Sequence, residues 1–166
     1  MLTSFRKVLN FPFNIGEGNM TREKLEELVK KLGGEILNVG KPVKTVEQAV
    51  KATNTSPDVI IKSLLFVSEK GPILVIVDGE SKVDLKKLSK RFGSVRFASP
   101  EEVKKITGYE IGAVPPVGVE VHTVVDSKVL EKDFVIGGGG AINKLSKLDP
   151  RKIVEYQKAE IMDVSK

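Results

Sequence analysis

The sequence contains no cysteine, no tryptophan and only one histidine, His122, among its 166 residues. Without cysteine, the chain cannot form a disulfide, a thiolate nucleophile or a cysteine-ligated zinc site. A single histidine excludes histidine-rich metal sites, and it leaves one candidate base for any Ser-His-Asp arrangement. We therefore expect no metal site and no cofactor.

Long apolar runs are also missing. No run approaches the length needed to cross a membrane, and Pro12 interrupts the N-terminal segment before the apolar core of a signal peptide could form. The content of hydrophobic residues, 40%, and of charged residues, 30%, is that of a soluble globular protein, and the expected location is cytoplasmic. The net charge of +5 favours an anionic partner such as nucleic acid, although a modest basic excess is common in proteins that bind none.

Helix and strand signals alternate along the chain after a lead-in segment, residues 1–20. Apolar residues spaced three and four apart predict a helix over 21–32, and capping residues predict further helices that begin after Thr45, Asp84, Ser99 and Asp149. Strands are predicted over 35–39, 59–67, 72–77, 95–97, 119–125, 134–136 and 158–162. The length suits one domain, residues 21–166. The predicted fold class is α/β (α+β), a single domain with a mixed, largely antiparallel sheet, curved or barrel-like, flanked by helices.

One lysine, Lys62, lies at the centre of the apolar strand over 59–67. Because strand side chains alternate, Lys62 shares a face with Ile60, Leu64 and Phe66, while Ser63 and its alternate neighbours point the other way. An ammonium group at such a position costs free energy unless it is paired or opens onto a cleft. Lys62 is therefore either a functional residue or a lysine that protects an edge strand from pairing with another sheet.

Two segments have an unusual backbone. Four glycines, 137–140, follow a predicted strand and offer unhindered main-chain amides, or simply form a flexible turn or bulge. They form neither a phosphate-binding P-loop nor a dinucleotide fingerprint, because the residues that would complete either motif are absent. The loop over 108–118 contains Gly112 and two prolines, Pro115 and Pro116, and cannot be helical. Together the two segments suggest a pocket built from main chain.

The order of these features resembles the YbaK/prolyl-tRNA synthetase-associated domain family of aminoacyl-tRNA deacylases. The resemblance spans roughly residues 21–160 and rests on the helix after Thr45, the strand with Lys62, the loop 108–118 and the glycine turn 137–140. It implies an enzyme that acts in trans on mischarged tRNA and hydrolyses the aminoacyl ester, in proline- or cysteine-related editing. The implied partners are the mischarged tRNA and an aminoacyl-tRNA synthetase. The lead-in, residues 1–20, has no obvious counterpart in the family.

The resemblance also implies roles for individual residues. Lys62 would position the 3′ end of the tRNA, and the main chain at Gly112, Gly137, Gly138 and Gly139 would stabilise the oxyanion that forms on the ester. The family is thought to use a hydroxyl of the tRNA ribose in the reaction, which would explain the lack of an obvious general base. An aminoacyl ester is already activated, so its hydrolysis needs a positioned water rather than a covalent nucleophile.

Four further residues are candidates for contact with the substrate. Tyr109 could stack on the terminal adenine or pack against its loop, and Pro116 lies in the same rigid loop. His122 could be a base near the pocket, although a lone strand histidine is more often packed or partly exposed. Asp126 could line the pocket or form an ordinary turn at a strand end.

Two alternative functions are compatible with the same predicted fold and pocket. One is a non-catalytic module that binds tRNA or a synthetase. The other is a small-molecule-binding domain, or a hydrolase of another activated ester, which would not need a basic surface.

Overall fold

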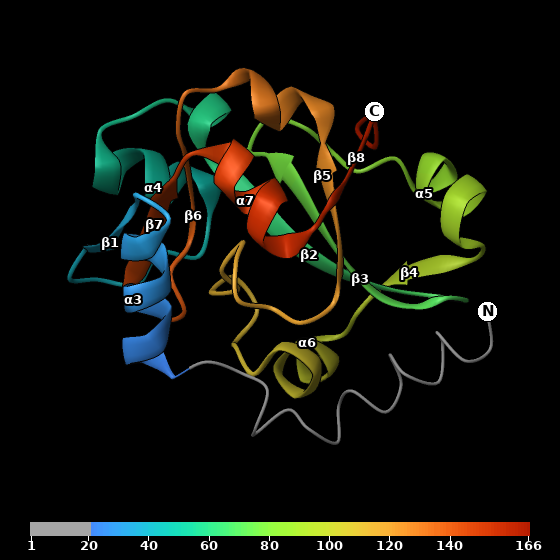
Figure 1. Cartoon of the computed structure of the whole chain (residues 1–166), viewed down its shortest axis with the longest axis horizontal. Coiled ribbons are helices and arrows are strands. Elements are labelled where there is room, and N and C mark those ends of the chain that lie inside the picture. The colour runs from blue at the N-terminus through green and yellow to red at the C-terminus, as the bar shows by residue number, and fades with distance from the viewer. Residues whose placement is uncertain (1–20) are drawn as a thin grey trace.

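The computed structural model describes residues 21–166, and this part of the chain forms two sheets flanked by helices (Figure 1). The five-stranded sheet has the order β4-β2-β3-β5-β8, and the three-stranded sheet has the order β1-β7-β6. In chain order the strands are β1 (Glu35–Asn38), β2 (Ile61–Ser68), β3 (Gly71–Asp78), β4 (Val95–Phe97), β5 (His122–Asp126), β6 (Val135–Gly138), β7 (Lys144–Leu148) and β8 (Glu160–Met162). The helices are α3 (Arg22–Lys31), α4 (Val46–Thr53), α5 (Leu85–Phe92), α6 (Pro100–Thr107) and α7 (Pro150–Gln157), with 3₁₀ turns η2 (Pro57–Val59) and η3 (Ser127–Glu131).

The four helices predicted from capping residues begin directly after those residues in the structure. The Thr45 hydroxyl accepts from the Gln48 amide at 3.1 Å at the start of α4. Ser99 and Glu102 form a complete capping box at the start of α6, and carboxylates cap α5 and α7. In α4 the Gln48 side chain accepts from the Lys44 amide at 2.7 Å, one residue before the cap. None of the described helices has the length and apolar character needed to span a membrane.

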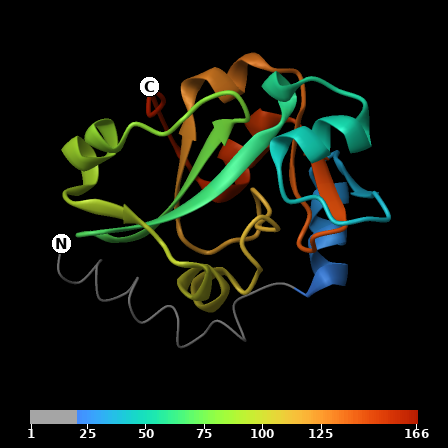
Figure 2. The ribbon, with the colours of Figure 1, turned by 180° about the vertical axis from the view of Figure 1, so that it is seen from behind.

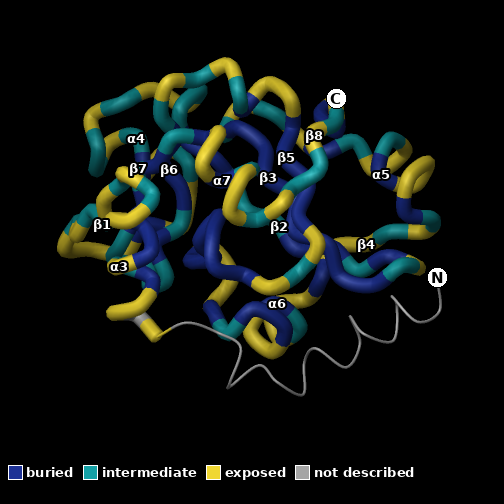
Figure 3. Tube along the Cα trace, viewed as in Figure 1, coloured by how far each residue is buried: buried dark blue, intermediate teal, exposed yellow. Residues whose placement is uncertain are grey.

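The mixed α/β class is confirmed, with one correction to the predicted single sheet. β2 and β3 form an antiparallel hairpin, whereas β3 pairs with β5 and β5 with β8 in parallel. An isolated parallel bridge between Ile60 and Ile136 joins the two sheets in the described part of the chain. β3 is buried along its whole length, and the buried trace in Figure 3 runs through the middle of the five-stranded sheet.

Two strand predictions need correction. β5 begins at His122 rather than at residue 119, because the Gln157 side chain accepts from the Gly118 amide at 2.9 Å and donates to the Val119 carbonyl at 2.8 Å. These side-chain bonds occupy main-chain groups that a longer strand would present to a neighbour. β7, residues 144–148, was not predicted at all, yet it is the central strand of the three-stranded sheet.

Strand β2 has a strand partner on both sides only in its second half. β3 pairs with all of β2, whereas β4 pairs only with Phe66–Ser68. The Leu65 carbonyl accepts from the Ala98 amide at 3.0 Å, just beyond the end of β4. Seen from behind, β2 crosses the molecule with α4 near one end and α5 near the other (Figure 2). In the described part of the chain, the open edge of β2 therefore lies at residues 61–64.

The glycine turn packs directly on the loop 108–118. A Cβ atom on Gly138 would overlap the Val114 carbonyl, which is main chain and has little freedom to move. The Gly140 amide donates to the Ala113 carbonyl at 2.9 Å, so the two segments are also joined by a hydrogen bond. Glycine at position 138 is thus required by the close approach of two backbones.

We predict that Gly138→Ala lowers the free energy of unfolding by about 3 kcal/mol, and that Gly137→Ala lowers it by about 1 kcal/mol. The Gly137 Cβ position lies 2.9 Å from Cγ1 of Ile61, a side chain that can shift, whereas Gly138 meets a carbonyl group. Urea unfolding of both variants measures the difference. Equal losses would show that the loop 108–118 yields as easily as a side chain does.

Candidate functional site

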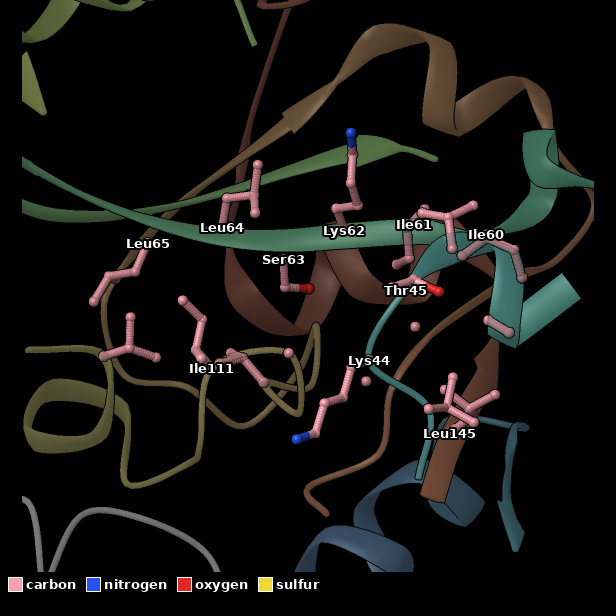
Figure 4. Close-up of a pocket in the computed structure, with 18 of the residues that line it drawn as sticks. Lys44, Thr45, Ile60, Ile61, Lys62, Ser63, Leu64, Leu65, Ile111 and Leu145 are labelled. Atoms are coloured by element: carbon pink, nitrogen blue, oxygen red, sulfur yellow. The ribbon is translucent and has the colours of Figure 1, made fainter. Parts of the chain in front are cut away.

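A cavity of about 350 Å³ lies beside the open edge of β2. Its walls come from β2, the start of α4, β6, the loop 108–118 and the segment after β4 (Figure 4). This volume is at the lower end of the range for small-molecule pockets. Most of the lining side chains are apolar: Val43, Val46, Ala49, Ile60, Ile61, Leu64, Leu65, Phe97, Ala98, Val103, Ile111, Val114, Ile136 and Leu145. The described lining residues include no carboxylate and no histidine.

Ser63 provides the polar groups on the wall of the cavity that β2 forms. Figure 4 shows its side chain on the opposite face of β2 from Lys62, directed toward the loop that carries Ile111. The Ser63 hydroxyl is buried and has no hydrogen-bond partner among the described residues. Main-chain groups two residues apart in a strand point the same way, and the Leu65 carbonyl faces the β4 side. The Ser63 amide and carbonyl therefore also face the cavity.

Sequence reasoning gave Ser63 no role, because no base accompanies it. The available signal was the strand alternation, which separates Ser63 from Lys62.

Lys62 lines the cavity, but its ammonium group turns away from it. The Lys62 Nζ donates to the Ser81 carbonyl at 2.5 Å, on the face of β2 opposite Ser63. Burial lowers the pKa of Lys62 below its ordinary value, the charge of Asp78 opposes this shift, and the charge of Lys82 adds to it. The group is thus a partly desolvated cation with one main-chain partner, at the point where β2 has an open edge.

Of the glycines predicted to stabilise the oxyanion, some line the cavity and others belong to the packing around it. Gly112, Gly137 and Gly138 line the cavity, whereas Gly139 does not. A Cβ on Gly139 would lie 2.6 Å from the Lys144 carbonyl carbon, so this glycine permits close contact with β7. Gly112 has φ +88° and no atom within 4 Å of its Cβ position, so its requirement for glycine comes from the backbone angle.

Tyr109 and Pro116 lie behind the cavity wall rather than in it. Tyr109 is buried with its hydroxyl unpaired among the described residues, and its ring is 3.3 Å from the Cβ position of Gly140. Burial raises the pKa of this phenol. Pro116 contacts the back of Gly137, with Cδ 3.6 Å from the Cβ position. Both residues support the glycine wall.

His122 and Asp126 also lie outside the cavity lining. His122 Nε2 is 2.8 Å from a Glu160 carboxylate oxygen, and the same carboxylate is bound by Arg91 at 2.7 Å. Asp126 is fully buried and accepts from the Val164 amide at 2.8 Å. In this structure Asp126 holds the segment after β8 in place.

A groove of about 550 Å³ adjoins the cavity. Lys62, Leu64 and Phe97 line both, so the groove and the cavity meet at these side chains. The groove is further lined by Lys82, Val83, Asp84, Leu85, Lys86 and Lys166. In residues 21–166 no group of three or more metal-ligating side chains is assembled. A small apolar cavity with main-chain walls, beside a groove rich in lysine, is suited to a compact apolar group carried on a polyanion.

Comparison with known proteins agrees with this class of site. Residues 40–156 match the family described as the aminoacyl-tRNA editing domain. The match covers more than half of the chain, and the chain belongs to this family. The predicted resemblance is thereby confirmed.

Three relatives illustrate the range of this similarity. A proline–tRNA ligase of Thermotoga maritima is 35% identical over 125 residues, which are 74% of this chain and 21% of the ligase. The chain thus spans about a fifth of the length of that relative. The uncharacterised protein YwhH of Bacillus subtilis is 37% identical over 127 residues, 74% of this chain and 81% of that protein. The crystal structure of a candidate trans-editing enzyme for prolyl tRNA synthetase has a TM-score of 0.79 at 29% identity, over 87% of this chain and 96% of that one.

We predict that Ser63→Ala raises the free energy of unfolding by about 1 kcal/mol, because it removes a buried hydroxyl that has no partner. Ser146→Ala is the matched control: the Ser146 hydroxyl is buried and donates to the Gly138 carbonyl at 2.7 Å. Its loss should lower stability by about 1 kcal/mol. Urea unfolding gives both values, and destabilisation by Ser63→Ala would mean that this hydroxyl is satisfied in the folded protein.

Proposed function

We propose that this protein hydrolyses the ester of mischarged tRNA, acting in trans and releasing a small amino acid. The observation that carries the proposal is the meeting of the apolar cavity and the lysine-lined groove at Lys62. The cavity has room for an amino-acid side chain, and the groove has the charge that suits RNA phosphates. Membership of the aminoacyl-tRNA editing family supports the same substrate class. Such a substrate would be met in the cytoplasm.

The chemistry requires little from the side chains. Water adds to the ester carbonyl carbon, the bond to the ribose oxygen breaks, and that oxygen leaves with a proton as the free hydroxyl. Main-chain amides at Ser63 and at the glycine wall are the groups available to bind the carbonyl oxygen as its negative charge grows. The cavity lining contributes no carboxylate or histidine in residues 21–166, so the proton acceptor would be a ribose hydroxyl or a second water.

Lys62 has a positioning role in this proposal. Its ammonium faces the groove rather than the cavity interior, so it would bind the terminal phosphate or ribose and hold the ester at the cavity entrance. The Ser81 carbonyl keeps the amine directed to this side before RNA binds. In this role the lysine contributes through placement and charge, and it need not exchange a proton.

The size of the cavity would select the amino acid. A difference of one methylene group changes binding by only about 1–3 kcal/mol, so a wall of packed apolar side chains sorts amino acids by steps of this size. Because the curated relatives include proline–tRNA ligases, we propose that the tRNA is one served by prolyl-tRNA synthetase and that this synthetase is a partner. The amino acid removed would be a small one, such as alanine or cysteine.

The direct test is a panel of tRNAs, each charged with a labelled amino acid of different size. We expect rapid release of small amino acids from tRNA for proline, and slower release of large ones. Quenched-flow measurement of released label, corrected for spontaneous hydrolysis, gives kcat/KM for each substrate. No release above the spontaneous rate from any member of the panel would reject the proposal.

Lys62→Ala should lower kcat/KM by about 10²-fold or more while the fold remains intact, because the RNA end would lose its positioning charge. Lys70→Ala is the matched control, since the Lys70 ammonium also donates to a main-chain carbonyl, that of Arg91 at 3.1 Å, but lies outside the cavity lining. Circular dichroism and unfolding curves check that both variants fold. Near wild-type rates in Lys62→Ala would remove Lys62 from the mechanism.

A second function, a non-catalytic module that binds tRNA or a synthetase, is favoured by one observation. The described cavity lining offers no carboxylate and no histidine. Tight binding of tRNA without release from any charged form would identify this function instead.

A further inference from the structure

Phe97 is the most exposed large apolar side chain in the described part of the chain, with 56% of its surface accessible. One side of its ring packs on Phe66, with ring centroids 4.5 Å apart and planes tilted by 37°. Phe66 is fully buried, so the Phe97 ring rests on the core while much of its surface stays open to solvent. Exposing an aromatic ring costs free energy, and neither the packing nor the proposed chemistry accounts for it.

The position of this ring is fixed from both sides. Phe97 pairs with Phe66 in the β4–β2 ladder, and the next residue, Ala98, donates its amide to Leu65. On the preceding residue, the Arg96 guanidinium forms two hydrogen bonds to the Glu102 carboxylate, at 2.8 and 2.9 Å. A ring held in this way can receive a flat ligand with little loss of side-chain entropy.

The groove beside Phe97 carries unneutralised positive charge. Lys82 and Lys86 line it and form no salt bridge with the described residues, in contrast to Lys87, which pairs with Asp163 at 2.9 Å. The acidic residue of the groove, Asp84, accepts hydrogen bonds from the first amides of α5. The free lysines and the aromatic ring together match the two parts of a nucleotide, its phosphate and its base.

We propose that Phe97 is the stacking platform for the terminal base of the RNA, and that Lys82 and Lys86 bind the phosphates that precede it. This assignment rests on the proposed function, because it assumes that the ester lies in the cavity. The ribose that carries the ester would then lie at the junction near Lys62. Its base would fall on Phe97, which borders both the cavity and the groove. Stacking and phosphate contacts read no sequence, so the platform would accept any RNA with the same single-stranded end.

A double-mutant cycle tests the platform by equilibrium binding, without hydrolysis. The probe is an uncharged RNA hairpin with a single-stranded 3′ end, made with a terminal adenine or with an abasic terminal nucleotide. Phe97→Leu keeps apolar packing on Phe66 but removes the aromatic face. It should weaken binding of the adenine probe about tenfold and leave binding of the abasic probe unchanged. Tyr156→Ala, at a partly exposed aromatic residue on α7, is the control and should change neither.

The phosphate contacts are tested by salt dependence. Replacing both Lys82 and Lys86 with alanine should reduce the slope of log K against log salt by about 1.4, the value for two lost single-strand phosphate contacts. The matched control replaces Lys30 and Lys31 on α3, and its slope should equal that of the wild type.

The possible results separate this inference from the proposed function. Equal losses with the two probes, no loss from Phe97→Leu, or no RNA binding by the wild type would overturn the platform. An unchanged salt slope would overturn the assignment of the lysines. If the base-dependent loss is found but no tRNA is deacylated, the platform stands and the hydrolytic function fails. If Phe97→Leu deacylates tRNA as fast as the wild type, with the same KM, the function stands and the platform fails.

Discussion

The site depends on one constraint in the five-stranded sheet: β2 has a second strand partner only over Phe66–Ser68. The cavity occupies the space beside the half of β2 that lacks a second partner, where another strand would otherwise lie. Alternation along that half then separates two kinds of chemistry. Ser63 directs uncharged polar groups to the apolar side, and Lys62 directs a cation to the side lined by lysines. A single strand thus divides the site into a part for a small side chain and a part for a charged polymer.

The wall of the cavity opposite β2 is made by two main-chain segments, the glycine turn and the loop 108–118, that pack closely on each other. Gly138 lies against the Val114 carbonyl, and Tyr109 and Pro116 support the glycine segment from behind. A wall of this kind is rigid because its atoms belong to two backbones linked by a hydrogen bond from Gly140. Rigidity suits a pocket that distinguishes ligands by size, and it also explains why several glycines predicted to be catalytic have a structural reason to be glycine.

Much of the fold could be predicted because its signals are local. Caps such as Ser99, and the alternation that places Lys62 and Ser63 on opposite faces, depend on neighbouring residues alone. β7 was missed because its Lys-Leu-Ser-Lys-Leu sequence is short and carries two lysines, and it becomes a strand through pairing on both sides. The open edge of β2 beside the cavity and the position of Phe97 could not be predicted, because both follow from where β4 begins to pair with β2.

A backbone bridge between Ile60 and Ile136 joins the two sheets, and the cavity has walls from both. Its width is consequently set by how far apart the sheets lie, and not only by the side chains that face it. A substitution in β1 or β7 that shifts the smaller sheet by a fraction of an ångström would widen or narrow the cavity without altering any residue that lines it. Selectivity in such a domain could drift through remote changes that leave every contact residue the same.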